Sequence, residues 1–209
     1  LSPRQAWNQL RQAGLRNGTE AQTLVYLRQL AWRDFAHHVL HYFPRSPLEP
    51  MYPKYRDFPW RQGHDELLLA WQQGRTGIPI VDAGMRELLQ TGFMHNRVRM
   101  VVASFLCKHL LIDWRWGERF FARHLLDFDL ASNAGGWQWA AGSGCDAAPY
   151  FRVFNPSSQL QKFDKDLIYV RKWVPEYGSS TYPKPIVDHA MARVRAIETY
   201  RSVLKPNPA

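Results

Sequence analysis

Helical periodicity without a strand pattern is the feature that most restricts what this chain can fold into. Between Glu20 and Tyr42 the apolar residues recur at the spacing of one helix face. They are Leu24, Leu27, Leu30, Ala31, Phe35 and Val39. No segment shows the sustained apolar–polar alternation of a half-buried strand. We therefore predict an all-α fold with no sheet of consequence, in one domain over residues 1–209.

Prolines, glycines and capping patterns divide the rest of the chain. Ser2 and Gln5 match a capping box, so a first helix is expected to begin there and to end by Gly18. Residues 44–63 are expected to form a loop, and residues 157–185, rich in Pro, Ser and Tyr, an irregular segment. Further helices are predicted over residues 64–73, 79–91, 95–112, 116–126 and 187–204.

The charge of the chain indicates a polyanionic partner. Its 209 residues carry a formal net charge of +9, which favours nucleic acid over an anionic membrane. The basic residues form no run, so a folded basic groove is favoured over a disordered arm. No apolar run is long enough to cross a bilayer, and Cys107 and Cys145 give no disulfide framework. We expect a cytoplasmic protein, and no Cys/His spacing indicates a metal site.

Residues 127–156 do not have the pattern of ordinary core. Asp127 and Asp129 stand among apolar residues, where a buried carboxylate needs a cationic partner or N–H donors. An Asn, paired glycines and a Trp-Gln-Trp run follow. Together these groups would suit a ligand that has N–H groups and an aromatic plane. The alternative is a helix cap at Asp129, Ser132 or Asn133 beside an aromatic core.

Two of the predicted helices mix polar and aromatic residues on a single face. On the helix from residue 20 this face holds Gln29, Trp32, Arg33 and Ala36. On the helix from residue 95 it holds Asn96, Arg99, Met100 and Ala103. Such faces make a poor dry core, so they indicate a ligand site. A half-exposed helix face is the alternative.

Taken together, these segments resemble the DNA photolyase/cryptochrome family. The motifs are D-x-D at 127–129, A-S-N-x-G-G-W-Q-W at 131–139 and D-A-A-P-Y-F-R-V-F-N-P at 146–156. Further segments are W-R-D-F at 32–35, A-W-Q-x-G-x-T-G-x-P-I-V-D-A at 70–83, M-H-N-R-V-R-M at 94–100 and L-L-I-D-W-R at 110–115. The resemblance covers nearly the whole chain and is closest to bacterial photolyases of the cyclobutane-dimer type. It implies their multi-helical FAD-binding domain.

The resemblance also implies a role for each matching residue. Around the flavin it places Tyr26, Arg33, Asn96, Arg99, Asp127, Asp129 and Asn133. Asn133 would lie beside the flavin N5 with a catalytic role, and Arg99 would form a buried ion pair with Asp127. At the DNA lesion or its phosphates it places Gln29, Trp32, Arg97, Met100, Trp139, Arg152 and Lys162. Trp60, Trp114 and Trp137 would pass electrons to the flavin, with Trp60 nearest the surface and Trp137 at the flavin.

The implied activity is light-driven repair of cyclobutane pyrimidine dimers in damaged DNA by a monomeric enzyme whose active cofactor is reduced FAD. The family carries a phosphate-binding loop and an antenna-pigment domain upstream of the matching segments. Neither is in this sequence, so we expect no antenna pigment, and FAD binding that is weak or absent. Gln29 stands where the cyclobutane type usually has Glu, and this departure concerns a residue that contacts the lesion. The alternatives are a cryptochrome-like photoreceptor and a flavin-free DNA-binding protein.

Overall fold

The structure is a computed structural model that describes residues 2–204, apart from the side chains of residues 15–17. Within that range it contains helices joined by turns and loops, and no strand. The helices are α1 (Pro3–Asn17), α2 (Glu20–Tyr42), α3 (Asp65–Gln72), α4 (Pro79–Thr91), α5 (Asn96–Ser104), α6 (Trp114–His124), α7 (Leu130–Ala141), α8 (Pro156–Phe163), α9 (Ile168–Trp173) and α10 (His189–Leu204). A 3₁₀ turn, Pro53–Tyr55, and a π-helical turn, Phe105–His109, complete them. The all-α prediction is confirmed.

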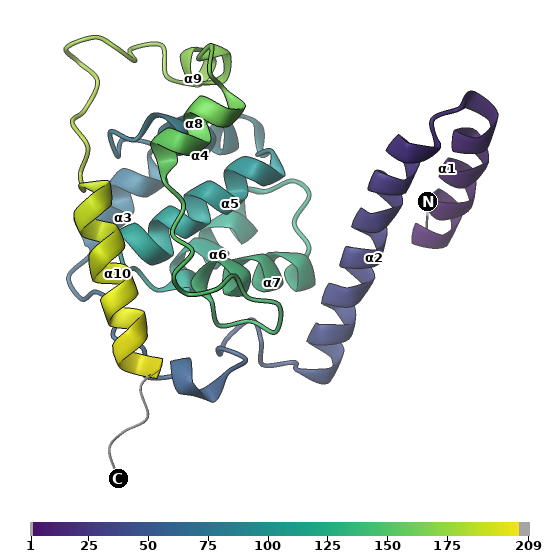
Figure 1. Ribbon diagram of the computed structural model, residues 1–209, viewed down its shortest axis with the longest axis horizontal. Helices are drawn as coiled ribbons and strands as arrows, with labels where there is room; N and C mark the ends of the chain where they lie inside the picture. The colour runs from purple at the N-terminus through teal and green to yellow at the C-terminus, as the bar shows by residue number, and fades with distance from the viewer. Residues whose placement is uncertain (1, 205–209) are drawn as a thin grey trace.

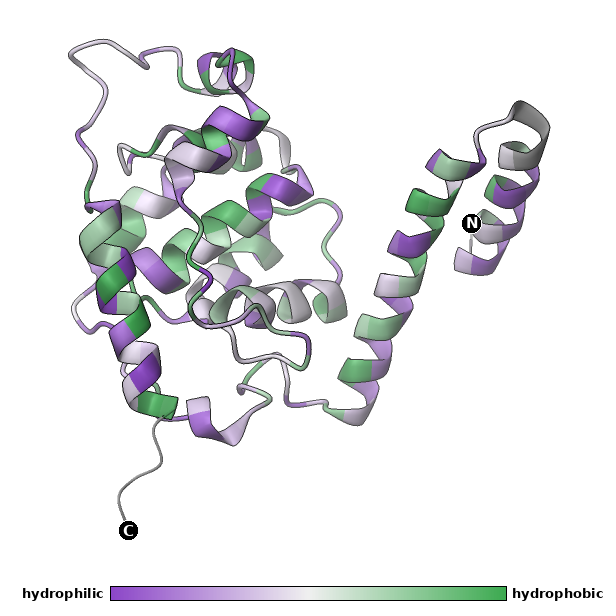
Figure 2. Cartoon of the chain, in the orientation of Figure 1, coloured by the Kyte–Doolittle hydropathy of each residue, from purple (hydrophilic) through white to green (hydrophobic). Residues whose placement is uncertain are grey.

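The helices form a bundle with a two-helix hairpin beside it. Figure 1 shows α1 and α2 on one side and α3 to α10 on the other, with α7 directed toward α2. α1 packs against α2, and α2 contacts the bundle through α7. Apolar and polar residues alternate along α2 (Figure 2), and its Leu24, Val25 and Tyr26 are exposed. No helix in the described part of the chain is long and apolar enough to span a membrane.

Several helix ends follow from local sequence chemistry. The Ser2 side chain accepts a hydrogen bond from the Gln5 backbone at 3.2 Å, and the Ser2 backbone donates to the Gln5 side chain at 2.8 Å. This is the predicted capping box. Gly18 and Gly92 end α1 and α4 in the left-handed region, at φ 64° and 70°, which glycine adopts without steric cost. The predicted bounds of α2 and α4 agree with the structure.

Two sequence predictions need correction. Residues 157–185 are not irregular throughout, because they contain most of α8 and all of α9. Asn155 caps α8 by accepting from the Ser158 backbone, and Pro156 occupies its first turn, so a start signal was present in the sequence. The helix predicted over 95–112 is α-helical only to Ser104 and then widens into the π-helical turn.

The T-G-x-P-I-V-D-A motif is explained by a buried carboxylate. Asp82 on α4 is fully buried and accepts hydrogen bonds from the Thr76 backbone and hydroxyl at 2.7 and 2.6 Å. It also accepts from the Gly77 backbone at 2.9 Å and from the Tyr182 hydroxyl at 2.7 Å. Four donors satisfy this carboxylate, so it ties the turn before α4 to the segment after α9.

Lys108 is a buried amine for which no hydrogen-bond partner is found among the described residues. It lies on the π-helical turn, and its Nζ is 3.6 Å from the centroid of the Tyr200 ring. A Cβ added to Gly142, just after α7, would lie 3.4 Å from the same Nζ. Burial lowers the pKa of Lys108 to about 7, against a smaller opposite effect of Cys107.

Replacing Lys108 with Met is expected to remove a pH dependence of stability. Because the pKa of Lys108 is lower in the folded protein than its usual 10.5, the unfolded chain binds more protons between about pH 7 and about pH 10.5. The free energy of unfolding of the wild type therefore rises with pH across that window. Met fills a similar volume without charge, so the variant should be more stable by about 1–4 kcal/mol at about pH 6.

Urea unfolding of both proteins at several pH values measures this difference. We expect the advantage of the Met variant to shrink steadily between about pH 7 and about pH 10. A difference in the free energy of unfolding that stays constant across this range would contradict the claim that the buried Lys108 amine loses its charge near neutral pH. A variant that is less stable than the wild type at every pH would contradict it too.

Candidate functional site

A cavity of about 600 Å³ lies between α2, α5, α7 and the loop after α7. Many of the residues predicted for the flavin and the lesion line it: Gln29, Trp32, Arg33, Asn96, Arg99, Met100, Asp127, Asp129, Asn133, Trp137 and Trp139. The two mixed helix faces predicted from sequence therefore face the same cavity, because α2 and α5 both pack against α7. The volume is within the usual range for a cofactor pocket, roughly 300–1,000 Å³.

Six predicted residues lie outside this lining. Tyr26 is on the exposed part of α2. Arg97 and Lys162 both lie against the Phe163 ring, at 4.7 and 5.4 Å from its centroid. Arg152 lies 6.0 Å from the centroid of the Trp139 ring, at the rim of the cavity. Trp60 and Trp114 are the remaining two, and they belong to the bundle interior.

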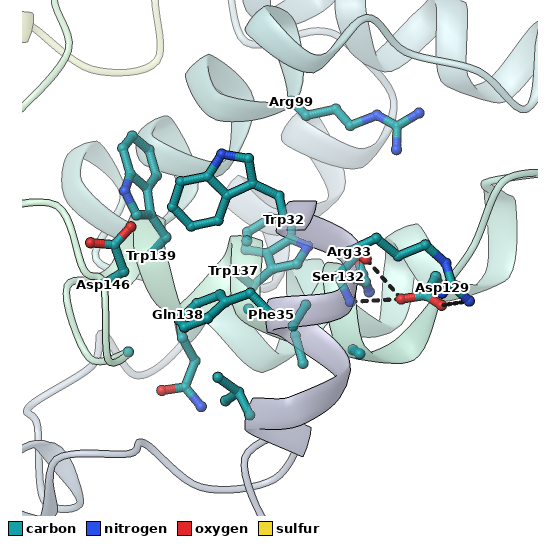
Figure 3. Close-up of a pocket in the computed structure, with 18 of the residues that line it drawn as sticks. Trp32, Arg33, Phe35, Arg99, Asp129, Ser132, Trp137, Gln138, Trp139 and Asp146 are labelled. Atoms are coloured by element: carbon teal, nitrogen blue, oxygen red, sulfur yellow. Dashed lines mark hydrogen bonds and ion pairs between the residues drawn. The ribbon is translucent and has the colours of Figure 1, made fainter. Parts of the chain in front are cut away.

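One end of the cavity is polar and is organised by Asp129. Its Oδ1 accepts from the Ser132 backbone at 2.9 Å and from the Ser132 hydroxyl at 2.8 Å, so Asp129 is the N-cap of α7. Its Oδ2 lies 2.9 Å from His37 Nε2. The same oxygen lies 3.9 Å from Arg33, whose side chain is drawn beside Asp129 in Figure 3. Burial raises the pKa of Asp129, but the hydrogen bonds from Ser132 and His37 outweigh it and lower the pKa. The carboxylate is therefore ionised and joins α2 to α7.

Arg99 pairs with Asp127, as predicted, but the pair is not buried. The Arg99 guanidinium donates to both carboxylate oxygens of Asp127, at 3.0 and 2.9 Å, and to the Met94 carbonyl at 2.6 Å. The Asp127 side chain is 54% exposed, so the prediction of a buried pair is wrong. An exposed pair contributes only about 0.2–1 kcal/mol to stability. Both side chains of the pair line the cavity.

Asn133 is held by a residue that sequence reasoning missed, Glu118 on α6. The Asn133 amide donates to the Glu118 carboxylate at 2.9 Å and to the Glu118 carbonyl at 3.1 Å. Glu118 is 7% exposed, and burial raises its pKa, while the Asn133 amide and Arg119 act in the opposite direction. Both amide hydrogens of Asn133 are directed to Glu118, so its amide oxygen remains available to a ligand.

Gly135 and Gly136 keep the wall of the cavity flat. Both line the cavity, and a Cβ added to either would meet no atom within 4 Å. A planar ligand ring can therefore lie against the backbone of α7, where any side chain would project into it. The carboxylates, guanidiniums and the Asn133 amide around this surface are hydrogen-bonding groups of the kind that the isoalloxazine ring of FAD needs.

The opposite end of the cavity is aromatic. Trp32 and Trp139 point into the same region from α2 and α7, beside Asp146, away from the polar end at Asp129 (Figure 3). Trp32 is 55% exposed, and Trp139 packs 6.3 Å from Phe154, centroid to centroid. Exposed indole faces at a cavity mouth are suited to flat bases.

The burial predicted for the three tryptophans is confirmed. Trp114 and Trp137 are each 2% exposed, whereas Trp60 is partly exposed and packs against two core clusters. Trp137 reaches α6 at Gly117, where an added Cβ would lie 2.0 Å from its ring. Trp114 is on the same buried face of α6, one turn earlier. Their role in electron transfer remains a prediction.

Comparisons with known proteins agree with this site. A family model described as the FAD binding domain of DNA photolyase matches residues 26–180. The deoxyribodipyrimidine photo-lyase of Escherichia coli K12 is 44% identical over 98% of this chain and 48% of its own length.

Two solved structures are similar in fold. A bacterial class III photolyase from Agrobacterium tumefaciens has a TM-score of 0.92 and 45% identity, covering 99% of this chain and 48% of that one. An archaeal photolyase from Sulfolobus tokodaii, solved with two FAD molecules, has a TM-score of 0.83 and 38% identity, covering 92% of this chain and 47% of that one.

The chain spans about half the length of these relatives. The family match covers most of its residues and includes the segments that form the cavity. The chain therefore belongs to the DNA photolyase family, in the part that carries the FAD-binding domain.

Proposed function

We propose that this chain binds FAD in the cavity and is the catalytic part of an enzyme that repairs cyclobutane pyrimidine dimers in DNA with light. The observation that carries this proposal is that one cavity has a polar end and an aromatic end. The polar end holds Asp129, with Asn133 one turn further along α7. The aromatic end holds Trp32 and Trp139 (Figure 3). A cofactor and a pyrimidine dimer flipped out of the duplex can therefore meet in one place.

The residues of the polar end would hold the cofactor. Gly135 and Gly136 leave space for a flat ring, and the carboxylates can accept from its N–H groups. Arg33 and Arg99 supply positive charge beside it. When bound in its reduced form, FAD supplies the light-driven electron chemistry. The chain supplies orientation, exclusion of water and a fixed set of charges.

The residues of the aromatic end would hold the lesion and its strand. A dimer must leave the duplex to reach the cavity, and a damaged base leaves its stack at lower cost. Trp32 and Trp139 would stack on it, Met100 and Gln29 would line its edge, and basic residues would hold phosphates. Those basic residues are Arg97, Arg152 and Lys162. A monomer acting in the cytoplasm completes the proposal.

Titration of FAD and of DNA into the same preparation tests this function. We expect saturable FAD binding, and tighter binding of a duplex with one thymine dimer than of the same duplex without damage. Trp32→Ala should weaken binding of the damaged duplex by about 5- to 100-fold, which corresponds to the loss of roughly 1–3 kcal/mol of base stacking.

Trp7→Ala is the matched control, because Trp7 is a partly exposed tryptophan on α1 that does not line the cavity. This control should bind both duplexes like the wild type. If both variants lost the same affinity for the damaged duplex, the assignment of the aromatic end would be refuted. It would also be refuted if the wild type bound the damaged and undamaged duplexes equally well.

A further inference from the structure

A second, smaller cavity lies behind the loop that borders the first. It measures about 340 Å³ and shares Gly144, Cys145 and Asp146 with the larger cavity. The rest of its lining consists of Tyr52, Lys54, Tyr55, Gly142, Ala147, Ala148, Pro149, Tyr150 and Leu204. The shared loop is therefore a thin wall with a cavity on each side. None of the site residues predicted from sequence lines this second space.

The chemistry of the second cavity suits a nucleotide. The Lys54 amine lies 5.5 Å from the centroid of the Tyr52 ring and 5.4 Å from that of Tyr55, so one cation lies between two aromatic rings. Tyr150 adds a third ring, and Asp146 is the one acid in its described lining. Aromatic faces stack on any base, and an ammonium group attracts a phosphate. A net charge of +9 also favours a polyanionic occupant.

Gln138 connects the walls of the two cavities through hydrogen bonds to the segment before Tyr52. Its amide donates to the Ser46 and Glu49 carbonyls at 2.6 and 2.9 Å, and its oxygen accepts from the Met51 backbone at 3.0 Å. The Tyr52 backbone then donates to Ser143 at 3.3 Å. Gln138 itself lines the first cavity, so the segment that carries Tyr52 is attached directly to its wall.

We propose that the second cavity binds an unpaired base of the strand opposite the lesion. This inference rests on the proposed function, because it is the extrusion of a dimer into the first cavity that leaves the opposite bases without partners. The shared loop lies next to the place of the extruded dimer, and the nearest unpaired base can enter the space behind that loop. Tyr52 is the stacking platform for this base, and Lys54 is the group that meets its phosphate.

A comparison of three duplexes isolates this contact. The first has a thymine dimer opposite two adenines, and the second has the same dimer opposite two abasic residues. The third has no lesion but contains a mismatched bubble, so its bases are unpaired without damage. Dissociation constants are measured in the dark by fluorescence anisotropy at one fixed salt concentration, for wild type, Tyr52→Ala and the control Tyr42→Ala. Tyr52 and Tyr42 are both exposed, so both variants should fold.

Tyr52→Ala is expected to weaken binding of the first and third duplexes by about 5- to 100-fold, the size of one lost base–aromatic stack. It should leave binding of the abasic duplex unchanged, and Tyr42→Ala should leave all three unchanged. Equal weakening on the first and second duplexes, or no weakening on the first, would overturn the inference. A wild type that does not prefer the dimer would instead count against the proposed function, while the bubble duplex still tests the second cavity.

Discussion

Replacement of Trp137 by Phe is expected to abolish light-driven reduction of FAD bound to this chain. Trp137 lines the cavity and is 2% exposed, so it is the buried tryptophan that can reach both a bound flavin and the bundle interior. Its ring lies 5.0 Å from Phe121 and 6.0 Å from Trp71, centroid to centroid. Phe is far harder to oxidise than Trp, so the substitution removes an electron donor while retaining an aromatic ring.

The measurement is the decay of the oxidised flavin absorption band under blue light with an external reductant. Trp173→Phe is the matched control, because Trp173 is also buried but packs in a separate cluster with α4 and lines neither cavity. The control should photoreduce at the wild-type rate. Repair by chemically reduced Trp137→Phe should persist, because that reaction starts from the reduced cofactor. Normal photoreduction in Trp137→Phe would remove this tryptophan from the electron path.

Gly117→Ala is expected to destabilise the folded chain by about 3 kcal/mol, at the upper end of ordinary overpacking effects. The added Cβ would lie 2.0, 2.4 and 2.6 Å from three atoms of the Trp137 ring, so α6 or the indole must move. The ring is enclosed by Phe121 and Trp71, which leaves little space for that movement. For a chain of this size the melting temperature should fall by roughly 6–12 °C.

Gly135→Ala is the contrasting variant, because its Cβ would meet no atom within 4 Å. Ala is favoured over Gly inside a helix, so the FAD-free protein should become more stable by about 0.5–1 kcal/mol. The same methyl group would project toward a bound ring, so FAD affinity should fall. Thermal melts of both variants measure the two changes in stability, and FAD titration measures the loss of affinity in Gly135→Ala. If Gly117→Ala were neutral, the close packing of α6 against Trp137 would be disproved.

The helical framework could be predicted because its signals are local. The Ser2 capping box, the proline at the start of α4 and the glycine after it each determine a helix end from within a few residues. The same kind of signal was present but overlooked at Asn155 and Pro156, before α8. The π-helical turn after α5 had no such local signal, because its geometry accompanies the burial of Lys108 and His109 in the bundle.

The site could be predicted in part, for a different reason. Helical spacing placed Trp32 and Arg33 on one face of α2, and the structure confirms that both line the cavity. Helical spacing could not predict the partner of Asn133, because Glu118 lies on a different helix, α6. The one available signal was its position on the buried face of α6, one turn after Trp114. The exposure of Asp127 depends on tertiary packing and was therefore predicted wrongly.

Light-dependent repair is the most direct measurement of the central claim. The chain is loaded with FAD, chemically reduced without oxygen and mixed with an oligonucleotide that contains one thymine dimer, and restored thymines are counted by chromatography after illumination. The proposal predicts that dimers are converted to thymines under blue or near-ultraviolet light, over several turnovers, and not in the dark. If the protein retains reduced FAD and binds the damaged DNA but gives the same product in light and dark, the proposed function is contradicted.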